Sequence, residues 1–251
     1  MALKNQEEYV IYKNMIKIEK NKFNINTEEM AQHGLHMGHC TSRIHPKMKP
    51  YLDGVKGVVY IINLQKTAEK LEEALGFIQK IISENKTLLL VGTKIQTKEL
   101  VKEFAIKCSL SYINERWLGG TFTNFEIIKK RVNHFKDLEK KKIEGELEKY
   151  TKKERIKIDK ELKNLEIKFG GIKNMEKLPE AIFVLDMKKD NIAVKEAKIK
   201  GIKIIGISDT NVNPALADYP IPANDDAIPA IRYILEKLKE AIENVKSNDN
   251  N

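Results

Sequence analysis

The sequence predicts an α/β protein with a Rossmann-like (flavodoxin-like) parallel sheet of about five strands, helices on both faces, and an inserted antiparallel helical hairpin. Two observations carry this prediction. Short, nearly continuous apolar runs alternate with segments of helical periodicity, which is typical of parallel strands buried on both faces. The alternation is interrupted once, from 124 to 168, where apolar residues recur at steps of three and four.

The expected elements follow one another along the chain. Asn26 precedes a short helix that should end near Gly34, and 58–64 is expected to be the first strand. Further strands are expected at 87–93, 111–114, 181–186 and 203–209, and further helices at 66–83, 97–107, 191–200 and 225–245.

The interruption predicts two antiparallel helices packed as a coiled coil. Gly145 and the Tyr150-Thr151 pair offer a turn between arms of about 20 residues, each reaching roughly 30 Å. Residues 129–168 contain fifteen Lys and Arg against nine Asp and Glu, a net charge of +6. The expected seam consists of Ile128, Val132, Phe135, Leu138, Ile143, Leu147, Ile158, Leu162, Leu165 and Phe169.

These patterns divide the chain into four parts. Residues 1–26 are expected to form a polar N-terminal extension, and 247–251 a disordered tail. The α/β globular domain comprises 27–123 and 170–246, and the protruding hairpin comprises 124–169.

The charge balance favours a polyanionic partner. The net charge is +9 and the isoelectric point is about 9.2, as in many nucleic-acid-binding proteins. Because 40 of the 45 cations are lysine, biased residue usage remains an alternative explanation. Two cysteines fit a reducing compartment, and we find neither a membrane-spanning run nor a secretory signal. The expected location is the cytosol.

The segment 115–131 is the strongest candidate for contact with a sugar-phosphate backbone. It contains the only tryptophan, Trp117, the adjacent glycines Gly119 and Gly120, and two of the five arginines. Arginine has the planar fork that binds phosphate bidentately, and glycine permits close approach of the backbone. Trp117 is equally compatible with a core position beneath the loop and with a base-stacking platform.

Four of the five histidines lie between 33 and 45, close to Cys40. Zinc is one interpretation, because imidazole and thiolate are its usual ligands. RNA contact and loop packing are preferred, because glycines break the helical spacing and the loop that follows is basic. Asp186 and Asp209 each end an expected strand, so both should lie at the carboxyl edge of the sheet. A mixed zinc site of His36, His39, Asp186 and Asp209 is therefore retained as the alternative, with turn and helix-cap chemistry as the other explanation of the aspartates.

The motifs of nucleotide-dependent enzymes are missing. No glycine-rich phosphate loop follows 88–94, and no Ser/His/Asp or Cys/His set has recognisable spacing. We therefore expect no catalysis, no small-molecule substrate and no required cofactor. A metal-dependent enzyme on a Rossmann-like scaffold remains the alternative function.

Several motifs, in order and over about residues 27–240, resemble the family of ribosomal protein S2 from the small ribosomal subunit. They include 116–124 (RWLGGTFTN), 34–39 (GLHMGH), 45–51 (HPKMKPY), 62–67 (INLQKT), 169–173 (FGGIK), 178–181 (LPEA), 208–211 (SDTN) and 223–228 (ANDDAI). The inserted hairpin resembles the bacterial type, which leaves a bacterial or an organellar origin open. Cys40 departs from the family pattern, and the long leader raises Met15 as an alternative start to Met1.

The resemblance implies a non-catalytic component of the cytoplasmic ribosome. It implies binding to small-subunit rRNA, contact with neighbouring small-subunit proteins and a part in holding ribosomal protein S1, with no membrane contact. Carried over by motif, the expected RNA-facing residues are Arg43, Lys47, Lys49, Lys94, Arg116, Trp117, Thr123, Asn124 and Arg131.

Overall fold

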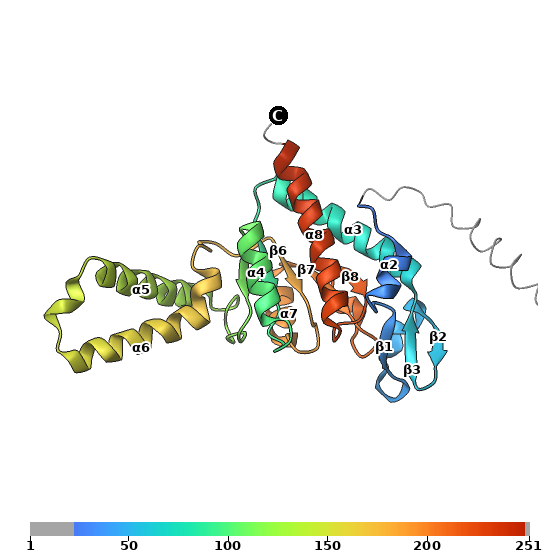
Figure 1. Ribbon diagram of the computed structural model, residues 1–251, viewed down its shortest axis with the longest axis horizontal. Helices are drawn as coiled ribbons and strands as arrows, with labels where there is room; N and C mark the ends of the chain where they lie inside the picture. The colour runs from blue at the N-terminus through green and yellow to red at the C-terminus, as the bar shows by residue number, and fades with distance from the viewer. Residues whose placement is uncertain (1–22, 249–251) are drawn as a thin grey trace, which may run out of the picture.

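A computed structural model describes residues 23–248 and shows a parallel sheet of five strands with helices on both faces (Figure 1). The strand order is β5-β4-β6-β7-β8. The first four strands of that order are β5 (Ser111–Ile113), β4 (Leu88–Val91), β6 (Ala181–Val184) and β7 (Lys203–Ser208), and all neighbours pair in parallel. The α/β fold class is confirmed.

Alternate residues of the central strands point to opposite faces, and each face has its own core. Leu88 and Leu90 pack with α3 (Leu64–Ser83), α4 (Lys98–Cys108) and α8 (Ile228–Asn248). Leu89 and Val91 pack with α7 (Asn191–Lys200) and the base of the hairpin. Strands that are apolar on both faces therefore require the two helical layers that the chain supplies.

One expected strand lies in a different sheet. Residues 58–64 contain β3 (Val59–Ile62), which is the middle strand of an antiparallel sheet with β1 (Met37–Cys40) and β2 (Leu52–Lys56). The fifth parallel strand is instead β8 (Tyr219–Pro222). β8 was not predicted because it contains two prolines, which argue against a strand in a sequence. They are tolerated because β8 is an edge strand with a single neighbour.

Two long helices project from the sheet as a hairpin (Figure 1). α5 (Phe125–Ile143) and α6 (Lys152–Phe169) contact each other, and most of the expected seam residues are buried or partly buried between them. His134 approaches Glu161 at 3.3 Å and Lys142 approaches Asp159 at 2.6 Å. Ile143 was expected in the seam but is 86% exposed, because α5 ends at this residue.

The hairpin rejoins the sheet through a close backbone contact. After α6, a short 3-10 turn at Gly170–Ile172 contacts β5. A Cβ on Gly171 would lie 2.2 Å from the carbonyl oxygen of Tyr112. Only glycine fits at this position without a shift of the backbone.

The structure revises both ends of the domain division. The expected extension 1–26 lies outside the described residues up to 22, but Phe23 and Ile25 are buried in the core and Asn26 caps α2 (Thr27–Gln32). At the other end, α8 continues through Asn248, two residues into the tail that was expected to be disordered. Residues 249–251 lie outside the described part.

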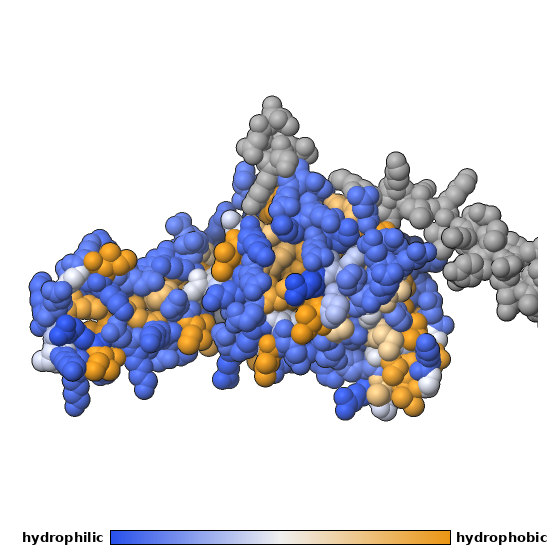
Figure 2. Space-filling model, in the orientation of Figure 1, coloured by the Kyte–Doolittle hydropathy of each residue, from blue (hydrophilic) through white to orange (hydrophobic). Residues whose placement is uncertain are grey.

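The surface is mostly hydrophilic, with an apolar patch at one end of the molecule (Figure 2). The patch covers the small antiparallel sheet, where Met37, Val55 and Val58 are exposed. Among residues 23–248, no helix is both long and apolar enough to cross a membrane.

Candidate nucleic-acid interface

The carboxyl edge of the parallel sheet gathers most of the residues that the sequence analysis selected. The segments that follow β4, β5, β6, β7 and β8 all leave the sheet at this edge because the strands are parallel. The small sheet is attached there as well, through the backbone of His39 and His45 bonded to Thr210. Ligands of doubly wound sheets bind at this edge, where the strand order reverses; here the reversal lies between β4 and β6.

Lys94 lies at the centre of this edge and is surrounded by carboxylates. Its Nζ is 3.1 Å from Asp186 Oδ2, 3.1 Å from Asp225 Oδ1 and 2.6 Å from Asp226 Oδ1. Burial alone lowers the pKa of the ammonium, but the hydrogen bond that it donates to Asp226 and the charges of Asp225 and Asp186 outweigh burial and raise the pKa. Lys94 is therefore a structural cation whose charge is neutralised within the protein.

Asp225 is the carboxylate most perturbed by this arrangement. Burial, together with the nearby charges of Asp186 and Asp209, raises its pKa to about 7, and Lys94 opposes the shift only in part. A carboxyl group with this pKa changes its charge in the physiological pH range.

His39 on β1 is held by the neighbouring loops. Its Nδ1 is 3.1 Å from Asp209 Oδ2, and its Nε2 is 2.8 Å from the Asn211 amide and 3.5 Å from Asp226 Oδ2. The hydrogen bond with Asp209 raises the pKa of His39, although burial opposes it. The Oδ1 of Asn211 lacks a partner among the described residues. If the Asn211 amide were turned over, this Oδ1 would face His39 Nε2 and could accept a hydrogen bond from a protonated His39.

The four residues of the zinc alternative separate into different surroundings. His39 and Asp209 lie together, and Asp226, which the sequence analysis did not select, completes a group whose ligand atoms are within 4.8 Å of one another. Asp186 instead pairs with Lys94. His36 is not a member of this group, and its Nδ1 is buried without a hydrogen-bond partner among residues 23–248.

A cleft of about 390 Å³ opens beside these groups. Its lining includes Arg43 from the small sheet and Lys188 and Lys189 from the loop after β6. None of these three side chains has an ionic partner among the described residues, whereas the carboxylates in the same cleft face Lys94. Lys188 and Lys189 were not predicted from the sequence. The available signal was a pair of adjacent lysines shortly after β6, a strand that ends at the carboxyl edge.

Trp117 lies in the core beneath the loop that connects β5 to α5. It is only 6% exposed, and its ring packs edge-on against Phe122 with centroids 4.8 Å apart. Of the two interpretations offered by the sequence, this placement supports the core position, because a base-stacking ring must present a face to solvent.

A buried carboxylate from α7 holds the same loop. Glu196 Oε1 accepts hydrogen bonds from Trp117 Nε1 at 3.2 Å and from Gly120 N at 2.7 Å. Its Oε2 accepts from Phe122 N at 2.9 Å, Thr123 N at 3.1 Å and Thr123 Oγ1 at 3.2 Å. Gly120 has φ +92°, a conformation that glycine adopts without strain. The sequence offered no sign of Glu196, since a glutamate in a helix is usually exposed.

The remaining candidates for RNA contact are on the surface. Thr123 and Asn124 are exposed at the start of α5, with the Thr123 hydroxyl on Glu196 and no capping bond from the Asn124 side chain. The exposed cations Arg43, Lys47, Lys49, Arg116 and Arg131 make no side-chain hydrogen bond or ion pair with any residue in the described part of the chain.

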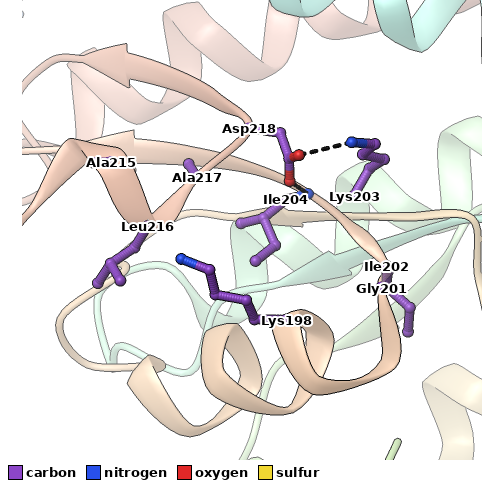
Figure 3. A pocket seen from close by; sticks show the side chains of 9 residues that line it. All are labelled: Lys198, Gly201, Ile202, Lys203, Ile204, Ala215, Leu216, Ala217 and Asp218. Carbon is purple, nitrogen blue, oxygen red and sulfur yellow. Dashed lines mark hydrogen bonds and ion pairs between the residues drawn. The ribbon is translucent and has the colours of Figure 1, made fainter.

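A second hollow, of about 220 Å³, lies at the opposite edge of the sheet (Figure 3). Its lining includes Lys198 and Leu216, and Lys203 at the start of β7 pairs with Asp218 at 2.8 Å. None of the residues selected from the sequence lines this hollow. The candidate interface is therefore confined to the carboxyl edge and the hairpin.

Comparison with known families supports the resemblance noted in the sequence. A family model described as ribosomal protein S2 matches residues 30–245. The match spans the small sheet, the parallel sheet and the hairpin, and covers far more than half of the 251 residues. The chain therefore belongs to the ribosomal protein S2 family and is a constituent of the small ribosomal subunit in the cytoplasm.

Proposed function

We propose that this chain binds small-subunit rRNA through exposed cations along the carboxyl edge of its sheet and on the first helix of the hairpin. The observation that carries the proposal is that five of the exposed cations selected from the sequence have no partner among the described residues: Arg43, Lys47, Lys49, Arg116 and Arg131. A cation already paired within the protein gains little from a phosphate, whereas an unpaired one releases a counterion when it binds. Lys94 and Trp117 are left out, because one is neutralised and the other is buried.

The two arginines are expected to contribute most per residue. Arg43 borders the cleft beside Lys188 and Lys189, and Arg116 precedes the loop held by Glu196. The arginine fork binds phosphate oxygens bidentately, while lysine acts as a point charge. Phosphate contacts of this kind fix position and orientation on RNA and carry no sequence information directly.

The test is binding of purified protein to small-subunit rRNA over a series of salt concentrations. The Arg43→Ala/Arg116→Ala double variant is expected to bind more weakly, with a slope of log K against log salt reduced by roughly 0.7 to 0.9 for each phosphate that is no longer neutralised. The matched control is Lys86→Ala/Lys203→Ala. It removes the same charge at the opposite edge, where both lysines already pair with carboxylates. Equal losses of affinity in the two variants would show that net charge alone drives binding.

We also propose that the chain helps hold ribosomal protein S1 on the small subunit. Its support is the family membership, and no surface of the chain is assigned to that contact. Small subunits assembled without this chain are expected to retain less S1 when quantified by mass spectrometry. Unchanged S1 content would refute the proposal.

Zinc binding is the second candidate, and the group formed by His39, Asp209 and Asp226 favours it. A zinc-dependent enzyme would further need an open coordination position and a paired general base. Metal binding must compete with the proton on His39, whose pKa is raised. We therefore propose a non-catalytic protein that needs no metal. One equivalent of zinc in protein purified without chelator, absent from His39→Ala, would reverse this choice.

A further inference from the structure

We infer that Glu196 is a positioning residue for RNA binding: its buried carboxylate holds residues 117–123 in the shape that presents Arg116 and Asn124 to rRNA. The inference rests on the proposed function, because it concerns how the RNA-facing loop is kept in place. Glu196 itself is 6% exposed and lies beneath the loop, so it does not touch RNA.

The loop depends on Glu196 more than on its own backbone. Between β5 and α5 its internal backbone bonds are Thr121 N to Leu118 O and Asn124 N to Gly120 O. Five further donors from this loop converge on one carboxylate: three backbone N–H groups, the Trp117 indole and the Thr123 hydroxyl. Clustered backbone N–H groups of this kind form an anion-binding nest. Here the anion is a side chain of the protein, so the nest is filled before RNA arrives.

The negative charge of the Glu196 carboxylate strengthens its hydrogen bonds to the loop. Burial raises the pKa of the carboxyl group, but the bonds from Gly120, Phe122, Thr123 and Trp117 outweigh burial and lower it. The carboxylate is therefore charged at neutral pH, and hydrogen bonds to a charged acceptor are the strong ones. An amide in its place keeps one acceptor oxygen and turns an NH₂ group toward donors of the loop.

The two residues that flank the bonded segment lie on the surface of the protein. Arg116 directly precedes the first bonded residue, and Asn124 directly follows the last one. Both side chains are exposed, and that of Arg116 has no partner among the described residues. Asn124 also precedes α5 without a side-chain capping bond. The direction in which the chain enters the hairpin is therefore fixed by the loop.

A double-mutant cycle on rRNA affinity separates positioning from general stability. Glu196→Gln is expected to weaken rRNA binding about tenfold in the wild-type background. The same substitution should have a clearly smaller effect in Arg116→Ala, because the charged one of the two positioned residues is already gone. In Arg43→Ala, at the far end of the interface, it should have its full effect. Equal effects in all three backgrounds would mean that Glu196 only stabilises the fold.

Trp117, the only tryptophan, reports on the loop without RNA. Glu196→Gln is expected to shift its fluorescence emission, because the indole loses a charged acceptor and gains solvent. A shifted emission with unchanged rRNA affinity would overturn the inference while confirming the contact. Failure of the wild-type chain to bind rRNA would refute the proposed function, and the inference with it, while the emission shift would still identify the contact. If Glu196→Gln does not fold, Glu196→Asp keeps the charge and enters the same cycle.

Discussion

At the scale of single residues, the carboxyl edge contains side chains whose charge depends on pH. Asp225 has its pKa raised to about 7 by burial and by the charges of Asp186 and Asp209, and His39 has its pKa raised chiefly by Asp209. In both cases the folded state binds a proton more tightly than the unfolded state. Stability therefore increases as the pH falls through this range.

The corresponding prediction compares the wild-type chain with Asp225→Asn. The free energy of unfolding of the wild type should rise from about pH 8 to about pH 6, by at most about 1.4 kcal/mol per pH unit for each proton bound. In Asp225→Asn the part due to Asp225 should be lost, so the slope becomes smaller. Urea unfolding at several pH values measures both slopes. Identical slopes would show that Asp225 does not titrate in this range.

The residue scale is also where prediction from sequence was least complete. Asp186 and Asp209 were placed correctly at the carboxyl edge because each follows an apolar strand. Their partners could not be predicted, since Lys94, Asp225 and Asp226 come from loops that only the folded sheet brings together. Glu196 was missed for the same reason: its donors lie 73 to 79 residues away in the chain.

At the scale of elements, periodicity identified the helices and four of the five parallel strands. Periodicity did not predict β8, and it did not predict which strands pair with β3. β8 contains two prolines, which are rare in central strands but allowed at an edge. The apolar run at β3 has the composition of a parallel strand, yet it pairs with β1 and β2, two short strands that have little apolar character. Composition predicts that a strand exists, but not which neighbours it takes.

The base of the hairpin offers a test of close backbone packing. Gly171→Ala is expected to destabilise the protein by about 1 to 3 kcal/mol, because the new Cβ would overlap the carbonyl of Tyr112. Gly170→Ala is the matched control. Its nearest neighbour would be 3.6 Å away, so its effect should stay within about 0.5 kcal/mol. Urea unfolding gives both values, and equal losses of stability would contradict the close approach.

The hairpin seam can be tested with one buried and one exposed position. Phe135 is 2% exposed between α5 and α6, and its replacement by alanine should cost about 3 to 5 kcal/mol. Ile143 belongs to the same apolar pattern but is 86% exposed, so Ile143→Ala should change stability by about 0.5 kcal/mol or less. Urea unfolding of the two variants gives both values. A large loss of stability at Ile143 would mean that the seam extends to the end of α5.

At the scale of the whole molecule, positive charge is divided between two distant parts. Residues 129–168 carry a net charge of +6 out of +9 for the chain, and the remaining exposed cations of the interface lie along the carboxyl edge. A helix of 18 residues, such as α6, is about 27 Å long. The tip of the hairpin and the edge of the sheet are therefore too far apart to share a phosphate.

This separation predicts additive decreases in rRNA affinity. Lys141, Lys152 and Lys153 near the tip are exposed and have no ionic partner among the described residues. Replacing all three with alanine should weaken binding and lower the salt slope by roughly 0.7 to 0.9 for each phosphate that the variant no longer neutralises. Combined with Arg43→Ala/Arg116→Ala, the changes in log K should sum, because distant sites act independently. A tip variant that binds like the wild type would show that the charge of the hairpin is only a solvated face.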